Sequence, residues 1–177
     1  MLSGTMQAAL NSQLNAELFS SYLYLSMAAN LESKNLKGMS HWFQVQAQEE
    51  MIHALKFYNF ILDRGGKVNL AAIEGPQTDW AMPLLAFLTA QEHEAKVTGL
   101  INNLVDLAIT EKDHASNAFL QWFVTEQVEE EASVLAVVES LKLSGDDSSG
   151  LFMIDKDLAL RPQPNLALAL GGGGTAA

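Results

Sequence analysis

The sequence contains no cysteine at any of its 177 positions. Disulfide bonds, thiolate metal sites, iron–sulfur clusters and cysteine nucleophiles are therefore excluded. It also lacks an apolar run of about eighteen residues, the length that a membrane-spanning helix needs. Residues 1–10 lack the basic stretch and apolar core of a signal peptide. These absences predict a cytoplasmic protein without a membrane partner.

Positive charge is also scarce in this chain. It has 10 Lys and Arg against 21 Asp and Glu, which gives a formal net charge of −11. Such a chain repels nucleic acid and anionic membranes and attracts cations. We therefore expect no nucleic-acid partner. Net charge alone does not show whether the acidic residues bind a specific cation, because that depends on their positions in the fold.

Helix-forming residues dominate what is present. Four long stretches, rich in Leu, Ala, Met, Gln and Glu at helical spacing, predict helices near residues 5–32, 37–64, 81–110 and 114–143. A shorter helix is predicted near residues 147–158. No alternating pattern of strand length lies outside these segments, so the predicted fold class is all-α.

The lengths of the connections predict how the helices are arranged. Short links near residues 33–36 and 111–113 favour antiparallel hairpins. The link near residues 65–80 is longer, and about fifteen extended residues span about 50 Å, more than the roughly 42 Å of a 28-residue helix. The sequence therefore predicts a four-helix bundle with a crossover that makes the second and third helices parallel.

The chain length fits one domain. We assign residues 1–160 to this domain, which includes the short fifth helix. Residues 161–177 contain four consecutive glycines and are predicted to form a flexible C-terminal tail.

The apolar face of each long helix contains one glutamate. Tracing each face at steps of three and four residues places one acid near the middle of every helix: Glu17, Glu50, Glu94 and Glu130. We call these the seam glutamates. Because all four are central, they meet at one level of the bundle whichever way the helices run. The alternative is that some of them face solvent.

Four carboxylates in an apolar bundle need protons, basic partners or cations. No Lys or Arg lies near the level of these glutamates on the apolar helix faces. His53, three residues after Glu50, is the nearest nitrogen base. With Gln127 these side chains form a hard, oxygen-rich set that suits iron or manganese. Glu50 and His53 also form the Glu-x-x-His motif of bundle di-metal sites.

A second group of acids lies beside the first. Glu49 precedes Glu50, while Glu126 and Glu129 are on the turn before Glu130 or adjacent to it. Most runs of acids are solvated helix faces. The spacing also allows these four to hold another cation next to the pair.

Tyr24 lies two turns from Glu17 on the same helix face. It is either a core tyrosine with a satisfied hydroxyl group or a redox-active phenol near the metals. Spacing alone favours the core tyrosine.

The chain resembles the non-haem bacterial ferritins, prokaryotic members of the ferritin-like di-iron superfamily. The resemblance covers roughly residues 2–160 and is specific. Its motifs lie at residues 15–18, 47–53, 94, 119–122, 125–131 and 150–156.

The resemblance implies a ferroxidase centre, in which Glu50 bridges two iron ions. The first iron would be bound by Glu17, Glu50 and His53. The second would be bound by Glu50, Glu94 and Glu130, with Gln127 nearby. A third iron site would use Glu49, Glu126, Glu129 and Glu130, and Tyr24 matches the tyrosine beside the centre.

The same resemblance implies a function in iron storage and detoxification. The protein would oxidise Fe(II) with dioxygen or peroxide and deposit ferric oxyhydroxide inside a hollow homo-oligomeric shell of 24 subunits. It is thus expected to be an enzyme, a ferroxidase.

Two alternatives remain. A haem-binding bacterioferritin has a second Glu-x-x-His on the fourth helix, where this chain has Gln127 to Glu130 without histidine. Its haem is bound by a methionine at the position of Met51, but methionine on a bundle helix more often serves packing, so we expect no haem. The second alternative is a metal-buffering bundle in which bound metal never meets oxygen.

Overall fold

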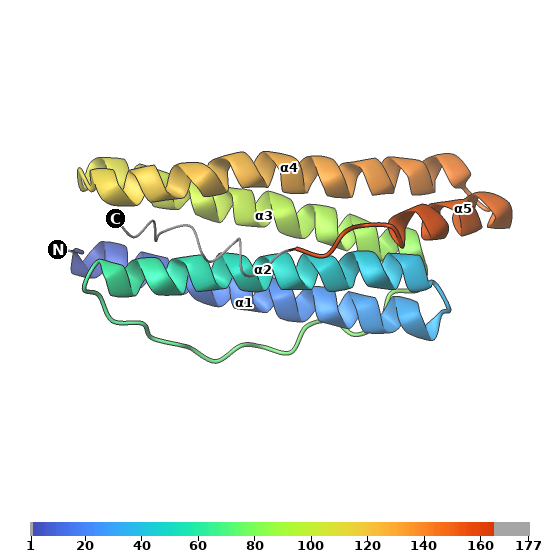
Figure 1. Cartoon of the computed structure of the whole chain (residues 1–177), viewed down its shortest axis with the longest axis horizontal. Coiled ribbons are helices and arrows are strands. Elements are labelled where there is room, and N and C mark those ends of the chain that lie inside the picture. The colour runs from blue at the N-terminus through green and yellow to red at the C-terminus, as the bar shows by residue number, and fades with distance from the viewer. Residues whose placement is uncertain (1, 165–177) are drawn as a thin grey trace, which may run out of the picture.

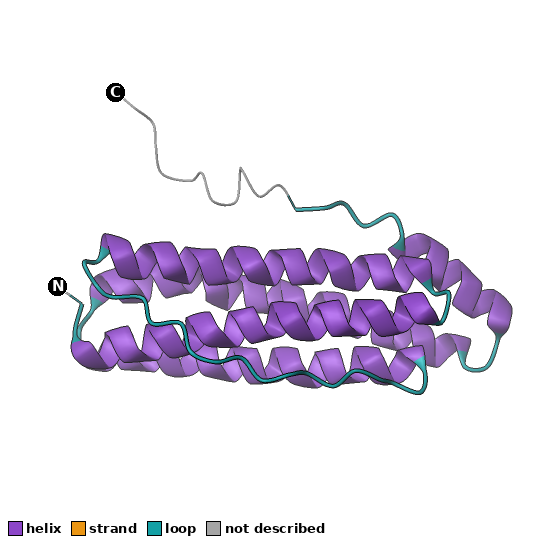
Figure 2. Cartoon of the chain, turned by 90° about the horizontal axis from the view of Figure 1, so that it is seen from below, coloured by secondary structure: helices purple, strands orange, loops and turns teal. Residues whose placement is uncertain are grey.

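The computed structural model describes residues 2–164, and within them the chain forms five α-helices and no strand (Figures 1 and 2). The helices are α1 (Gly4–Ser33), α2 (Lys37–Asp63), α3 (Pro83–Thr110), α4 (His114–Ser144) and α5 (Ser148–Leu158). The predicted all-α class is confirmed, and the bounds differ from the predicted ones by two residues at most. None of the described helices is long and apolar enough to cross a membrane.

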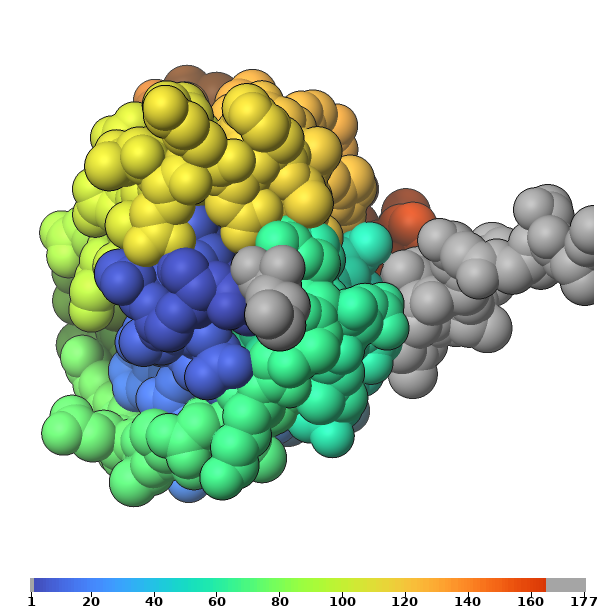
Figure 3. All heavy atoms as spheres, turned by 90° about the vertical axis from the view of Figure 1, so that its left-hand side faces the viewer, coloured from blue at the N-terminus to red at the C-terminus, as the bar shows by residue number. Residues whose placement is uncertain are grey.

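The four long helices form two antiparallel hairpins, α1–α2 and α3–α4, that lie side by side (Figure 1). The segment from 64 to 82 runs the length of the bundle, so that α2 and α3 point in the same direction (Figure 1). Seen end-on, the end of α3 and the start of α4 lie beside the start of α1 (Figure 3). The predicted crossover is therefore present.

The crossover segment is attached to α1 by polar side chains. Asn11 Nδ2 donates to the main-chain oxygen of Lys67 at 3.0 Å, and Ser26 Oγ donates to that of Gln77 at 2.6 Å. These contacts give hydrogen-bond partners to a backbone that has no regular secondary structure. The segment is thereby held along the outside of α1, and the bundle core stays closed beneath it.

The hydrophobic core consists of two clusters, one toward each end of the bundle. One contains Tyr24, Phe43 and Phe87, and the other contains Phe57 and Phe123. All five side chains are fully or almost fully buried. The polar level that carries the seam glutamates lies between the two clusters, so close packing on both sides fixes the helices that position them.

The short helix α5 packs across the start of α2. Gly38 permits this contact because a Cβ atom there would overlap the main-chain oxygen of Asp155. The Asp155 side chain in turn accepts a hydrogen bond from the main-chain nitrogen of Met39 at 2.9 Å, which caps an otherwise free N–H group in the first turn of α2.

The chain continues past α5 as a short segment, residues 159–164, that we call the C-terminal strap. Arg161 of the strap contacts α2, although it belongs to the predicted tail. The greater part of that tail, residues 165–177, lies outside the described residues.

Candidate metal centre

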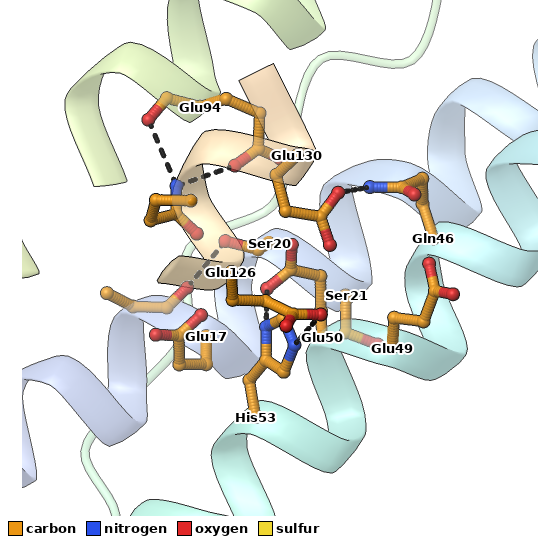
Figure 4. A network of polar contacts seen from close by, with 12 residues as sticks. Glu17, Ser20, Ser21, Gln46, Glu49, Glu50, His53, Glu94, Glu126 and Glu130 are labelled. Carbon is orange, nitrogen blue, oxygen red and sulfur yellow. Dashed lines mark hydrogen bonds and ion pairs between the residues drawn. The ribbon is translucent and has the colours of Figure 1, made fainter. Parts of the chain in front are cut away.

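Each of the four long helices contributes one buried glutamate to the middle of the bundle (Figure 4). The exposed fractions are 1% for Glu17 and Glu50, 0% for Glu94 and 5% for Glu130. The alternative that some of these acids face solvent is therefore wrong. The bundle holds four carboxyl groups away from water, and no Lys or Arg side chain contacts any of them within the described residues.

His53 completes a group of three possible metal ligands with Glu17 and Glu50. One ligand atom of each lies within 4.8 Å of those of the other two, and all three residues are buried. His53 Nδ1 lies 3.4 Å from Glu50 Oε2 (Figure 4). The first ligand set implied by the resemblance is thus assembled by α1 and α2 alone.

A second group joins His53 to α4. Ligand atoms of His53, Glu126 and Glu130 also lie within 4.8 Å of one another, and His53 Nε2 is 3.9 Å from Glu126 Oε1. The resemblance places Glu130 in two sites, the second with Glu50 and Glu94 and the third with Glu49, Glu126 and Glu129. In this structure Glu94 belongs to neither group, and both of its carboxylate oxygens accept hydrogen bonds.

Hydrogen-bond donors around the centre hold the carboxylates in place. Gln127 Nε2 donates to Glu94 Oε2 at 3.1 Å, and the Tyr24 hydroxyl group donates to Glu94 Oε1. Tyr24 is fully buried, so it is a core tyrosine with a satisfied hydroxyl group and at the same time a direct neighbour of the centre.

Two further glutamines support the site and were missed by the sequence analysis. Gln13 Nε2 donates to Glu17 Oε1 at 2.8 Å, and Gln46 Nε2 donates to Glu130 Oε2 at 2.7 Å. Each lies four residues before a seam glutamate, so both face the interior. That spacing is the signal by which they were detectable.

Two carboxylate oxygens in the centre have no hydrogen-bond partner, although Glu50 Oε2 lies 3.4 Å from His53 Nδ1. Glu17 Oε2 and Glu50 Oε2 are buried and accept no hydrogen bond. Leaving a buried acceptor unpaired is unfavourable by about 1–3 kcal/mol. A cation bound between these atoms satisfies both, and oxygen donors with one imidazole suit iron. The residues present therefore fit the metal.

Burial raises the pKa of every seam glutamate. The pKa values of Glu17 and Glu50 are raised well above the usual value, first by desolvation and then by neighbouring carboxylates. Desolvation also raises the pKa of Glu94, and it raises that of Glu130 to about 7. Without a cation, each of these groups keeps its proton to a higher pH than a solvated glutamate does.

The residues predicted for a third metal are only partly brought together. Glu126 is half-buried and belongs to the second group, whereas Glu129 is exposed and belongs to neither. Glu49 is half-buried, and its Oε2 accepts a hydrogen bond from Arg161 Nη2 at 2.6 Å. Its carboxylate is turned away from His53 (Figure 4).

A polar path connects the centre to the surface. The groove between α3 and α4 has a volume of about 620 Å³ and reaches Gln127. Thr98 Oγ1 donates to the exposed Glu131 Oε1 at 2.5 Å, and Gln127 Nε2 lies 3.3 Å from Thr98 Oγ1. Glu94 is therefore linked to solvent through Gln127, Thr98 and Glu131.

Comparisons with known proteins agree with this arrangement. The family model described as "Ferritin-like domain" matches residues 7–144. A bacterial non-heme ferritin of Bacteroides fragilis is 44% identical over 161 residues, which are 91% of this chain and 100% of the relative. The corresponding protein of Staphylococcus aureus (strain MRSA252) is 38% identical over 91% of this chain and 97% of its own length.

Solved structures give the same match. The open-pore ferritin of the hyperthermophilic archaeon Archaeoglobus fulgidus superposes with a TM-score of 0.91 at 52% sequence identity. The superposition covers 92% of this chain and 100% of that chain. An engineered closed form of the same archaeal protein also has a TM-score of 0.91, at 51% identity over 93% of this chain and 100% of that chain.

Proposed function

The chain belongs to the ferritin family, and we propose that the seam glutamates and His53 form its ferroxidase centre. Members of this family store iron and oxidise it, and the chain is a ferroxidase of this kind. The observation that carries the residue assignment is the pair of buried, unpartnered oxygens on Glu17 and Glu50 within reach of His53.

The first Fe(II) binds between Glu17, Glu50 and His53, whose ligand atoms already converge. The raised pKa values of Glu17 and Glu50 mean that Fe(II) displaces protons from these carboxyl groups as it binds. Gln13 holds the other oxygen of Glu17, so that its unpartnered oxygen faces the ion.

The second Fe(II) binds on the α3–α4 side, to Glu94 and Glu130 with Glu50 as the shared ligand. Here the structure holds the carboxylates through Tyr24, Gln127 and Gln46. Rotation of Glu94 away from its two donors frees its oxygens. Gln127 then remains beside the second ion as an oriented amide.

Oxidation follows from the charge of the site. Each Fe(II) gives up one electron to the oxidant, dioxygen or peroxide, and becomes Fe(III). Carboxylate ligands favour the product because Fe(III) carries more positive charge for them to neutralise, and this preference is strong where water is excluded. The oxidised iron then leaves for the storage compartment, and the carboxylates are free to bind again.

The storage compartment is a shell of 24 copies of the chain. Large apolar side chains on the outside of the bundle support this assembly, among them Leu25, Phe152 and Met153, which are 50%, 61% and 66% exposed. Apolar side chains exposed on a single subunit are removed from water where subunits meet. Sizing of the native particle tests the assembly directly.

Substitution of the shared ligand tests the centre. We expect Glu50→Ala to slow the oxidation of two Fe(II) per subunit in air by at least about 100-fold, because loss of even a supporting residue costs metal sites about 10–100-fold. The absorbance of the ferric product measures the rate. Glu139→Gln, which alters an exposed acid paired with Lys142, is the matched control.

An equal rate in Glu50→Ala and wild type would overturn the assignment. Loading with Fe(II) without air, followed by exposure to air, separates the ferroxidase from a metal buffer. A ferric species supports oxidation at the centre, whereas unchanged Fe(II) supports the buffer.

A further inference from the structure

Arg161 of the C-terminal strap lies at the outer edge of the centre. Its Nη2 donates to Glu49 Oε2 at 2.6 Å, and the two side chains are only 19% and 25% exposed. A charge-assisted hydrogen bond that is largely shielded from water is stronger than an exposed surface pair. The carboxylate adjacent in sequence to Glu50 is therefore occupied by a basic side chain.

Arg161 is also fixed by contacts that do not involve Glu49. Its guanidinium group lies 4.5 Å from the centre of the Trp42 ring, and its main-chain oxygen is 2.8 Å from His41 Nε2. Its Nη1 is buried and has no hydrogen-bond partner. These contacts hold the guanidinium beside the centre whichever way Glu49 turns.

Glu49 itself lies where it can serve the centre but is turned from it. Its neighbour Glu50 points inward, and Glu126 approaches His53 to 3.9 Å from α4. Among the described residues, neither group of converging ligand atoms includes Glu49. Its carboxylate points away from His53 (Figure 4), and Arg161 is the partner that it has instead.

We propose that Arg161 competes with a cation bound beside the ferroxidase centre for the carboxylate of Glu49. This inference rests on the proposed function, since it concerns a third ion next to the di-iron pair. Glu49 exchanges the guanidinium for the ion, and the two positive charges repel each other while both are near. Arg161 is thus a positioning residue that lowers the cation affinity of a third site and leaves the affinities of the first two sites unchanged.

The test is a titration of the iron-free, full-length protein with Zn²⁺, which binds carboxylate and imidazole ligands but undergoes no redox reaction. Calorimetry gives the number of sites and their affinities. In Arg161→Gln we expect the third Zn²⁺ to bind about tenfold more tightly, the gain from removing one charge-assisted contact. The first two sites keep their wild-type affinities.

Arg64→Gln is the matched control. Arg64 is the only other arginine in the sequence, and it forms a comparable pair with Asp113 at 3.0 Å, with side chains 21% and 13% exposed. We expect it to leave all Zn²⁺ affinities unchanged. Glu49→Gln should remove the difference between wild type and Arg161→Gln, because both backgrounds then lack the contested carboxylate.

Arg161→Lys keeps the charge but loses the planar group that stacks on Trp42, so its third site should have an intermediate affinity. If Arg161→Gln does not fold, the affinity of the third site in Arg161→Lys still tests the competition between Arg161 and the cation. An unchanged or weaker third site in both variants, or no third site in either, would overturn the inference. Failure of the wild type to bind the first two ions would contradict the proposed function instead.

Discussion

Glu130 lies on α4 with an exposed fraction of 5%, and Gln46 is its hydrogen-bond donor. Desolvation, followed by the charge of Glu94, raises its pKa to about 7. The pKa of an unfolded glutamate lies near 4.5. The contribution of Glu130 to the free energy of unfolding is therefore fully present below the pKa of the unfolded state. It is lost as the pH rises through the pKa of the folded state.

The pH dependence due to Glu130 predicts how the stability of the metal-free protein changes with pH. Raising the pH from about 5 to about 8 should lower its free energy of unfolding, and Glu130 alone accounts for on the order of 3 kcal/mol. Glu130→Gln cannot ionise, so its stability should fall less over the same range. Urea unfolding at the two pH values measures the difference. Equal pH dependence in the two proteins would contradict the prediction.

Periodicity in the sequence predicted the buried acids because seam positions recur at helical spacing. The same geometry explains Glu126 and Glu129. Glu126 is four residues before Glu130 and shares its face, whereas Glu129 is rotated by about 100° from it and faces solvent. The contact between Arg161 and Glu49 could not be predicted from periodicity. The two residues are 112 positions apart, and Arg161 lies in a segment without periodicity.

At the scale of elements, the close approach of α5 to α2 at Gly38 gives another prediction. Gly38→Ala introduces a Cβ that overlaps backbone of α5, and such overpacking destabilises by about 1–3 kcal/mol. We expect a lower melting temperature and faster amide exchange in residues 148–158. Because α5 leads into the strap, the contact between Arg161 and Glu49 should also weaken.

Gly99→Ala is the control for this substitution. Gly99 is exposed in the middle of α3 and has open space where a Cβ would lie. Alanine there should stabilise the helix by about 0.5–1 kcal/mol. A loss of stability in both variants would show that the Gly38 contact has no special role.

The elements themselves were largely predictable. Helix bounds and the crossover follow from local propensity and from loop length, which are properties of neighbouring residues. The side to which α5 turns was not predictable in the same way. It depends on the close contact between Gly38 and the backbone of Asp155, and no local sequence pattern predicts that contact.

At the scale of the whole molecule, each chain carries a complete set of seam glutamates and His53. Assembly and oxidation should therefore be separable. Leu25, half-exposed on the groove between α1 and α2 beside Met51, is a suitable position to test this. Leu25→Glu should favour smaller species in analytical ultracentrifugation, because it buries a charge in an apolar contact.

The dissociated variant should still oxidise Fe(II) within about a factor of ten of the wild-type rate, since the substitution lies outside the centre. It should fail to keep the ferric product in solution, which light scattering detects. Loss of oxidation together with assembly would show that the centre depends on a neighbouring subunit.

The position of the centre relative to the two hairpins has one more consequence. Glu17, Glu50 and His53 come from one hairpin, and Glu94 and Glu130 come from the other. The only covalent connection between the hairpins is the segment from 64 to 82. In the proposed ligand arrangement, ions bound by both sides would act as a reversible cross-link that opposes separation of the hairpins. Iron bound in this way would stabilise the subunit as well as serve as its substrate, and each round of release would remove this link between the two hairpins.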